Sequence, residues 1–98
     1  MTKSYIGSIQ DAILRTHGCV ASYLESVPVK EVFQGRVAWE GDVEVFSVEH
    51  PKAKLCYAWG FKDDAGQWQY VAVLNTPPVD SPKRAVQAYI FTQVKKSH

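Results

Sequence analysis

Four segments rich in β-branched and aromatic residues follow one another through the middle of this chain, and turn-forming residues separate them. Residues of this kind favour strands, while short spacers that contain Gly, Pro or Asp favour tight connections. The predicted strands cover residues 19–27, 37–48, 54–61 and 68–74. Because the later strands follow one another after short spacers, we predict an antiparallel meander of four strands.

The connections between these strands differ in how clearly the sequence predicts them. Residues 49–52 and 63–66 are predicted to form turns on either side of the third strand. Pro28 indicates an edge position or an interruption soon after the first strand, and Gly41 indicates a bulge within the second. Residues 28–36 are compatible with a strand or a loop, so their conformation stays open.

A helix is predicted on either side of this strand-rich region. Within residues 4–17, apolar side chains recur at steps of three and four, and Gly18 can adopt the left-handed conformation that ends a helix. The second helix begins at Asp80-Ser81-Pro82, where a capping side chain precedes proline at the first helical position. The order of elements is then α-β-β-β-β-α, an α+β fold in a single domain that spans residues 1–98.

The charge and hydropathy of the chain argue against several classes of partner. Its 11 basic and 10 acidic residues give a net charge of +1, so no long-range field attracts polyanions, and no nucleic-acid partner is expected. The longest apolar run, residues 70–74, is far shorter than the about 20 residues of a membrane-spanning helix. No apolar stretch follows the first residues, so we expect a cytoplasmic protein whose Cys19 and Cys56 are reduced.

The registers of the last three strands sort their side chains onto two faces. If both connecting loops hold four residues, Lys62 lies opposite Gln67 and Val48 lies opposite Ala53. One face then collects small or β-branched residues: Val43, Val45, Cys56, Ala58, Val71 and Val73. The other face collects aromatic residues, one leucine and two carboxylates: Asp42, Glu44, Phe46, Leu55, Tyr57, Trp59, Phe61, Trp68 and Tyr70.

This second face is predicted to remain exposed, because two short helices cover only one face of such a sheet. A large exposed aromatic surface marks an interface or a ligand site, and we expect homodimerisation through it, because two-fold homodimers are the commonest oligomers. Two other arrangements stay open: the helices pack on the aromatic face, or one helix covers each face. A change of one residue in either loop would also exchange the faces.

The candidate interface or ligand-binding residues share the predicted aromatic face. They are Asp42, Glu44, Phe46, Tyr57, Trp59, Phe61, Trp68 and Tyr70. Aromatic faces attract organic cations, and a carboxylate at the rim adds a full charge, so the two acidic residues beside the rings resemble a site for a small cationic or aromatic ligand. A plainer interpretation is that Glu44 pairs with a lysine at a dimer seam or faces solvent.

No residue pattern supports catalysis, metal binding or a cofactor. His17, Cys19, His50 and Cys56 lack the paired spacing of a structural zinc site, and the scattered glycines form no phosphate-binding loop. We therefore predict no catalytic residue, no metal ligand and no cofactor, and we favour a non-enzymatic homodimeric binding module.

Two alternatives remain. A small enzyme would place its pocket between the sheet and the second helix, with Glu44 as the general base. A nucleic-acid or toxin-antitoxin partner would bind polyanions in a salt-dependent way.

Three stretches of the chain carry a resemblance to a known group of proteins: Trp39-Glu40-Gly41-Asp42-Val43-Glu44-Val45-Phe46, His50-Pro51-Lys52-Ala53-Lys54 and Cys56-Tyr57-Ala58-Trp59. In these stretches the chain resembles small uncharacterised bacterial proteins, some of them encoded by mobile integron gene cassettes, and the likeness runs from about His17 to Ala88. The resemblance implies a cytoplasmic bacterial protein that self-associates and has an accessory or adaptive role. It assigns no activity, and it gives no residue a role.

Overall fold

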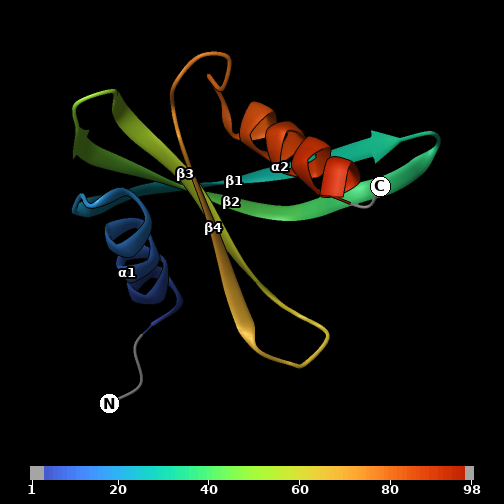
Figure 1. The fold of residues 1–98 in the computed structure, drawn as a ribbon, viewed down its shortest axis with the longest axis horizontal. Helices are drawn as coiled ribbons and strands as arrows, with labels where there is room; N and C mark the ends of the chain where they lie inside the picture. The colour runs from blue at the N-terminus through green and yellow to red at the C-terminus, as the bar shows by residue number, and fades with distance from the viewer. Residues whose placement is uncertain (1–3, 97–98) are drawn as a thin grey trace.

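The chain folds as a helix, a four-stranded sheet and a second helix (Figure 1). The computed structural model describes residues 4–96. Its elements are α1 (Tyr5–His17), β1 (Ala21–Phe33), β2 (Arg36–His50), β3 (Ala53–Lys62), β4 (Trp68–Leu74) and α2 (Pro82–Lys96). All four strands pair antiparallel in the order β1-β2-β3-β4, so the predicted α+β meander with flanking helices is confirmed. Within the described range, no helix has the length and apolar character needed to cross a bilayer.

Capping side chains set the helix ends at the predicted positions. The Ser4 hydroxyl accepts a hydrogen bond of 3.0 Å from the Gly7 amide at the start of α1. Gly18 ends that helix in the left-handed conformation, with φ 71°. At the start of α2, the Ser81 hydroxyl accepts a hydrogen bond of 3.2 Å from the Arg84 amide. These caps determine where each helix joins the strand-rich region.

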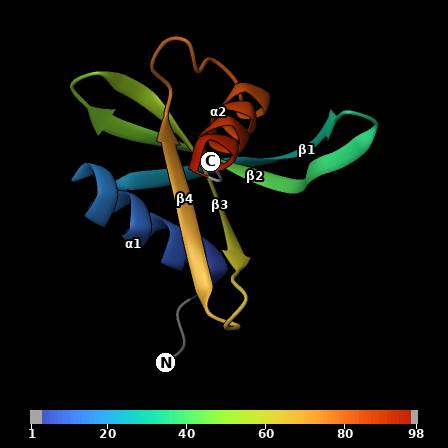
Figure 2. The same cartoon turned by 45° about the vertical axis from the view of Figure 1, so that its right-hand side comes forward.

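β1 and β2 continue past the body of the sheet as a two-stranded arm (Figures 1 and 2). β1 runs through Pro28, which lies opposite Asp42, to a tight turn at Gln34 and Gly35 with φ values of 52° and 77°. The stretch left open by the sequence is thus strand and turn, and β1 continues past the proline with one irregularity of the ladder between Glu31 and Val32. Proline is tolerated here because β1 lies at the edge of the sheet.

The predicted bulge at Gly41 is wrong. Gly41 pairs regularly with Val29, and the irregularities of the β1–β2 ladder lie elsewhere. The ring of Trp39 covers this position, since its nearest atom would lie 3.3 Å from a β-carbon at Gly41. Here a glycine in a strand marks close packing rather than an extra residue.

The predicted register between β3 and β4 is wrong by one residue. Lys62 lies opposite Trp68 rather than Gln67, so the connecting loop holds five residues. The Asp63 carboxylate accepts hydrogen bonds of 2.9 Å from the amides of Ala65 and Gln67, which draws the chain into this wider turn.

The predicted register between β2 and β3 is wrong by two residues at the turn and by one residue beyond it. Ala53 lies opposite His50 rather than Val48, because β2 runs further and the turn after it is shorter. An irregularity between Ser47 and His50 then shifts the remaining pairs. Such a shift moves the β2 side chains to the opposite face relative to β3.

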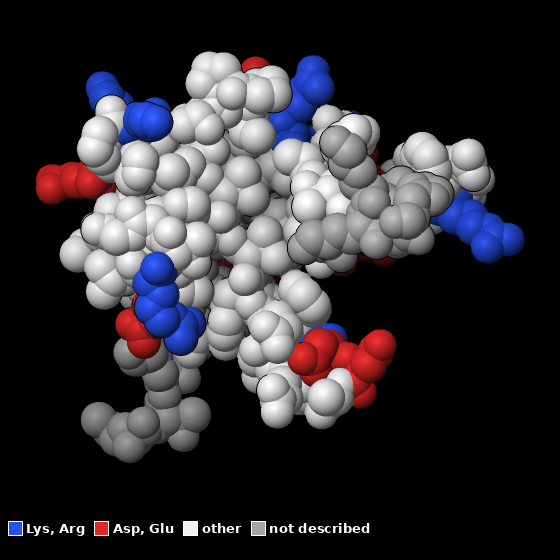
Figure 3. All heavy atoms as spheres, viewed as in Figure 1, with Lys and Arg blue, Asp and Glu red and all other residues white. Residues whose placement is uncertain are grey.

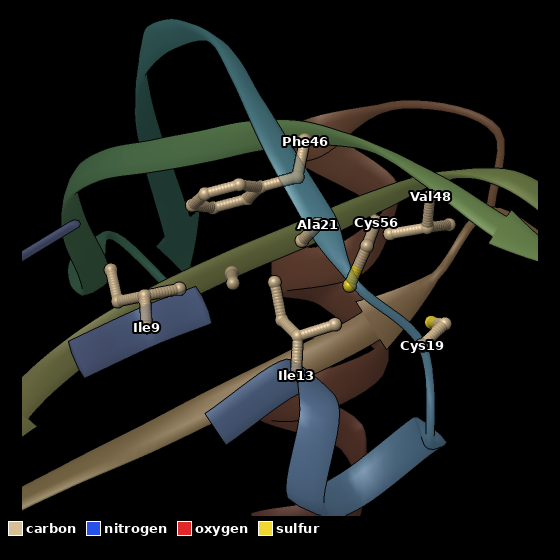
Figure 4. Packing of buried hydrophobic residues seen from close by; sticks show 8 residues of the cluster. Ile9, Ile13, Cys19, Ala21, Phe46, Val48 and Cys56 are labelled. Atoms are coloured by element: carbon tan, nitrogen blue, oxygen red, sulfur yellow. The ribbon is translucent and has the colours of Figure 1, made fainter. Parts of the chain in front are cut away.

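One helix therefore covers each face of the sheet, which is one of the arrangements that the sequence left open. Figure 4 shows the α1 side, where Ile9 and Ile13 of the helix pack against Phe46 and Cys56. The residues buried on the α2 side are Val29, Val43, Val45, Tyr57, Trp59, Val79, Ala85 and Val86. The predicted single aromatic face does not form, because its members are divided between the two sides, and the small-residue face is divided in the same way.

The sheet forks where β2 and β3 part. Pairing between these strands ends at Glu44 and Ala58, whereas β2 stays paired with β1 as far as Arg36, and β3 with β4 as far as Lys62. The arm and the β3–β4 hairpin consequently diverge (Figures 1 and 2).

Candidate functional site

A cavity of about 250 Å³ lies in the fork between β2 and β3, and we call it the fork pocket. Its walls are Tyr5 of α1, Trp39, Glu40, Gly41, Asp42 and Glu44 of β2, and Trp59, Gly60 and Phe61 of β3. Side chains alternate along a strand, so the three acidic residues that β2 contributes to this wall point to the same side of the strand. The wall thus holds three carboxylates and no basic side chain.

Glu44 is the buried carboxylate of this wall. The residue is 5% exposed, and its two carboxylate oxygens accept hydrogen bonds of 3.1 Å from the hydroxyls of Tyr23 and Ser26 on β1. Both donors are neutral, and no Lys, Arg or His forms an ion pair with Glu44 in the part of the chain that the structure describes. An ionised carboxylate that is buried without a cationic partner is unfavourable, so a positive charge beside Glu44 would stabilise it.

Tyr5 joins α1 to the opposite wall. Its hydroxyl accepts a hydrogen bond of 2.8 Å from the Gly60 amide, beyond the last β2–β3 pair. A β-carbon at Gly60 would lie 2.9 Å from ring carbons of both Tyr5 and Tyr70, so glycine is what leaves room for the two rings. Burial raises the pKa of Tyr5, the bond from Gly60 lowers it, and the charges of Glu44 and Asp42 raise it further. Burial and the nearby carboxylates thus both disfavour ionisation of this hydroxyl.

Aromatic rings in mutual contact form the back of the pocket. The ring centroids of Trp39 and Trp59 lie 5.3 Å apart at an interplanar angle of 65°, and those of Trp59 and Tyr89 lie 5.5 Å apart at 87°. Edge-to-face contacts of this kind hold the rings in fixed orientations. Trp59 is 2% exposed, and its buried indole Nε1–H has no acceptor among the described residues. The aromatic wall is thus preformed, with one donor unused.

The structure brings four of the predicted candidate residues together in the fork pocket: Asp42, Glu44, Trp59 and Phe61. It places the other four elsewhere. Phe46 lies in the α1 core, and Tyr57 lies beneath α2, where its hydroxyl accepts a hydrogen bond of 2.7 Å from the Asn75 side chain. Trp68 and Tyr70 stack on each other at 6.3 Å on β4.

Sequence reasoning missed five residues of the pocket: Tyr5, Trp39, Glu40, Gly41 and Gly60. The alternation of acidic residues along β2 could have predicted that Glu40 shares a face with Asp42, because Glu40 stands two positions before it. No local signal marks Tyr5, since its place depends on how α1 packs against the fork.

A second cavity, of about 440 Å³, lies between the tip of the arm and α2, and we call it the arm groove. It is lined by Glu31, Val32, Phe33, Ala38, Gln87, Ile90 and Phe91. At the arm tip, Val32, Phe33 and Val37 are 58%, 60% and 52% exposed. Apolar side chains gathered in this way on a surface mark contact with another molecule.

His17 and His50 lie within hydrogen-bond distance of the backbone, and Cys56 is buried in the core. The His17 Nε2 atom lies 2.9 Å from a carbonyl oxygen of β4, and the His50 Nδ1 atom accepts a hydrogen bond of 3.0 Å from the Lys52 amide. Burial, together with neighbouring Cys19, raises the pKa of Cys56 to about 12, so this thiol is protonated at neutral pH. Between residues 4 and 96, the described side chains include no group of three or more potential metal ligands.

The two alternative functions, polyanion binding and catalysis by Glu44 beside α2, each require a particular placement of side chains. Figure 3 shows Lys and Arg side chains standing apart from one another over the viewed face, without a continuous basic patch. Glu44 lies opposite Ala58 on the α1 side, so it does not line a pocket between the sheet and α2.

Comparison of the chain with protein-family models, with curated proteins and with solved structures finds no significant match, so its function has to be argued from the geometry of these two cavities.

Proposed function

We propose that this protein binds a small organic cation in the fork pocket. The observation that carries the proposal is the buried carboxylate of Glu44, whose hydrogen-bond donors are neutral hydroxyls. A positive charge in the pocket would compensate it, and Glu40 and Asp42 add two further carboxylates to the wall. The pocket therefore favours cations over anions and neutral molecules.

The aromatic wall favours an organic cation over a metal ion. Ring faces attract ammonium and guanidinium groups by about 0.5–2 kcal/mol, with the larger values in desolvated sites. Trp39 and Trp59 line the pocket beside the carboxylates. A hard metal ion instead needs several oxygen ligands around it, and the described residues gather no such group.

The volume of the pocket limits the ligand to a small molecule. At about 250 Å³, the cavity lies below the range of about 300–1,000 Å³ that is typical of sites for drug-sized ligands. One cationic group with a few attached atoms is the expected occupant.

Calorimetric titration with choline, butylammonium and guanidinium tests the proposal, with acetate as the anionic control. We expect saturable binding of at least one cation, a change in tryptophan fluorescence at the same concentrations, and no binding of acetate. The fluorescence should respond because Trp39 and Trp59 line the pocket. The absence of saturable binding by all three cations would refute the proposal.

Charge-removing variants connect binding to the pocket. Glu44→Gln and Asp42→Asn keep the side-chain shape, and we expect each to weaken cation binding about tenfold, or about 1.4 kcal/mol. Glu49→Gln is the matched control, because Glu49 is an exposed carboxylate on the same strand outside the pocket wall. An equal loss in this control would indicate a general charge effect instead.

We also propose that two copies of the chain associate through the arm groove. Val32, Phe33 and Val37 are apolar but more than half exposed, and they lie at the tip of an arm that projects from the body. Two-fold exchange would allow the arm tip of one copy to enter the groove of the other. This surface differs from the aromatic face expected from the sequence, of which Phe46 and Trp59 are buried within one chain.

Light scattering over a dilution series tests this association. We expect a mass of twice 11.0 kDa, and a shift to the monomer when Phe33→Ser removes the apolar tip. Leu14→Ser is the control, because Leu14 is an exposed apolar residue on α1, away from the groove. A wild-type protein that stays monomeric at millimolar concentration would contradict the dimer and leave the cation site untouched.

A further inference from the structure

We infer that the cation bound in the fork pocket is the side chain of an extended peptide, whose backbone pairs antiparallel with the free edge of β2. The inference rests on the proposed function, because it uses the same pocket and the same charge. It adds the chemical class of the partner: a polypeptide segment in which lysine or arginine alternates with apolar residues.

β2 has a free edge along the fork. It is paired with β1 as far as Arg36, whereas its pairing with β3 ends at Glu44. Among the described residues, residues 36–43 of β2 therefore have a partner strand on one side only. The N–H and C=O groups of such an edge can pair with an added strand, which is a recurring mode of peptide recognition. Antiparallel pairing is the more stable kind, and this sheet uses it throughout.

Pro28 shows which residues of this edge point their backbone into the fork. It lies opposite Asp42 in a regular stretch of the β1–β2 ladder. Because proline has no N–H, its nitrogen faces away from the ladder when it stands in an edge strand. Two directly opposed residues bond to each other through both backbones or through neither, so the N–H and C=O of Asp42 also point away from β1 and into the fork. The same alternation directs those of Glu40 into the fork.

The β3 wall agrees with this direction. The Leu55 carbonyl accepts a hydrogen bond of 2.9 Å from the Asn75 amide, just after β4, so alternation directs the amide of Gly60 the other way, toward the fork. The Tyr5 hydroxyl accepts a hydrogen bond of 2.8 Å from this amide. Tyr5 thus occupies the β3 edge, while the described residues supply no backbone partner for the facing edge of β2.

The side chains of this edge carry a charge complementary to a basic peptide. A residue that pairs with Asp42 shares its face of the sheet, and there Glu40, Asp42 and Glu44 line the pocket without a basic residue. Asp42 is the main anchor, since its partner on β1 is Pro28. Glu40 lies opposite Lys30, which places one positive charge on its other side. A lysine or arginine opposite Asp42 therefore brings its charge to the carboxylates.

The next residue of the peptide turns to the other face of the sheet. It would lie opposite Gly41, where the nearest ring atom of Trp39 is 3.3 Å from the position of a β-carbon. An apolar side chain suits contact with this ring. The favoured pattern is thus basic, apolar, basic.

A five-residue peptide tests the inference by calorimetric titration. Acetyl-Thr-Lys-Val-Lys-Thr-amide has the favoured pattern, and butylammonium represents its charged group without a backbone. We expect the peptide to bind at least about tenfold more tightly, because it adds backbone hydrogen bonds to the charge contact.

Methylated peptides of the same charge separate backbone pairing from charge. In the antiparallel arrangement, both lysine N–H groups point to β2 and the valine N–H points away from it. N-methylation of either lysine should therefore weaken binding about tenfold. N-methylation of the valine is the matched control, and it should change the affinity by less than about twofold.

Amide hydrogen exchange in the wild-type protein locates the added strand. The peptide should slow exchange at the amides of Asp42 and Glu40, because both point into the fork. The amide of Gly41 points to β1 and should exchange as before. Butylammonium, which has no backbone, should slow none of the three.

The outcomes distinguish this inference from the proposed function. If butylammonium binds but the peptide binds no more tightly, or if methylation of the lysines changes nothing, the inference is wrong while the cation site stands. If the peptide, butylammonium, choline and guanidinium all fail to bind, the proposed function itself fails.

Discussion

The hydroxyl of Tyr5, at the start of α1, accepts a hydrogen bond of 2.8 Å from the Gly60 amide of β3, although the two residues stand 55 positions apart in the chain. The bond joins the N-terminal helix to the inner wall of the fork pocket. The position of α1 and the shape of the pocket therefore depend on each other.

Removal of this hydroxyl should destabilise the fold. Tyr5→Phe keeps the ring but leaves the Gly60 amide without its acceptor, and we expect the free energy of unfolding in urea to fall by about 1 kcal/mol. Tyr70→Phe is the control, because its ring packs at the same glycine while its hydroxyl has no hydrogen bond among the described residues. Equal losses in both variants would show that the hydrogen bond contributes nothing.

A side chain at Gly60 should be destabilising. In Gly60→Ala the new methyl group would lie 2.9 Å from ring carbons of Tyr5 and Tyr70, and overpacking of this kind costs about 1–3 kcal/mol. Gly41→Ala should cost less, because its methyl group would lie 3.3 Å from the ring of Trp39. Thermal unfolding compares the two variants, and a larger loss at Gly41 would contradict the packing described.

The buried thiol of Cys56 should make the fold less stable in alkali. Burial raises its pKa from 9.0 to about 12, so the unfolded chain loses this proton first as the pH rises. The contribution to stability is complete below pH 9.0 and is lost progressively up to about pH 12. Urea midpoints measured from pH 7.5 to 10.5 should fall, and Cys56→Ala should flatten that slope. An unchanged slope in the variant would contradict the assignment to this thiol.

The loop carboxylate of Asp63 should titrate below its ordinary pKa of 3.8. Hydrogen bonds from the Gln67 amide, the Gln69 side chain and the Ala65 amide stabilise its charged form and lower the pKa. Its contribution to stability is therefore present above pH 3.8 and is lost as the pH falls through the native pKa. NMR titration of this carboxyl and of the Gln67 amide should give one common midpoint, and a midpoint at or above 3.8 would contradict the loop geometry.

The element order and the helix ends could be predicted from the sequence because their signals are local. Ser4, Gly18 and the Ser81-Pro82 pair act within a few residues of the boundaries that they set. The strand registers could not be predicted, because they depend on details of the turns. The Asp63 carboxylate binds two amides and closes a five-residue loop, although the same residues also suit a turn of four.

The residues of the candidate site also differ in whether local sequence could predict them. Asp42 and Glu44 belong together because they alternate along one strand, a relationship that any register preserves. Tyr57 and Tyr70 were grouped with them only through the registers, and neither lines the pocket. Tyr5 and Gly60 meet through the docking of a helix on a sheet, which the sequence does not signal locally.

The forked sheet builds most of its cavity from the parting of two hairpins, and α1 adds Tyr5 to the wall. Glu40 and Asp42 in its wall are exposed and belong to neither hydrophobic core, so exchanging these two side chains disturbs little of the packing that holds the fold. These two positions of the proposed cation site therefore lie apart from the residues that hold the core together. Substitutions there would alter the charge of the pocket while the architecture stays constant.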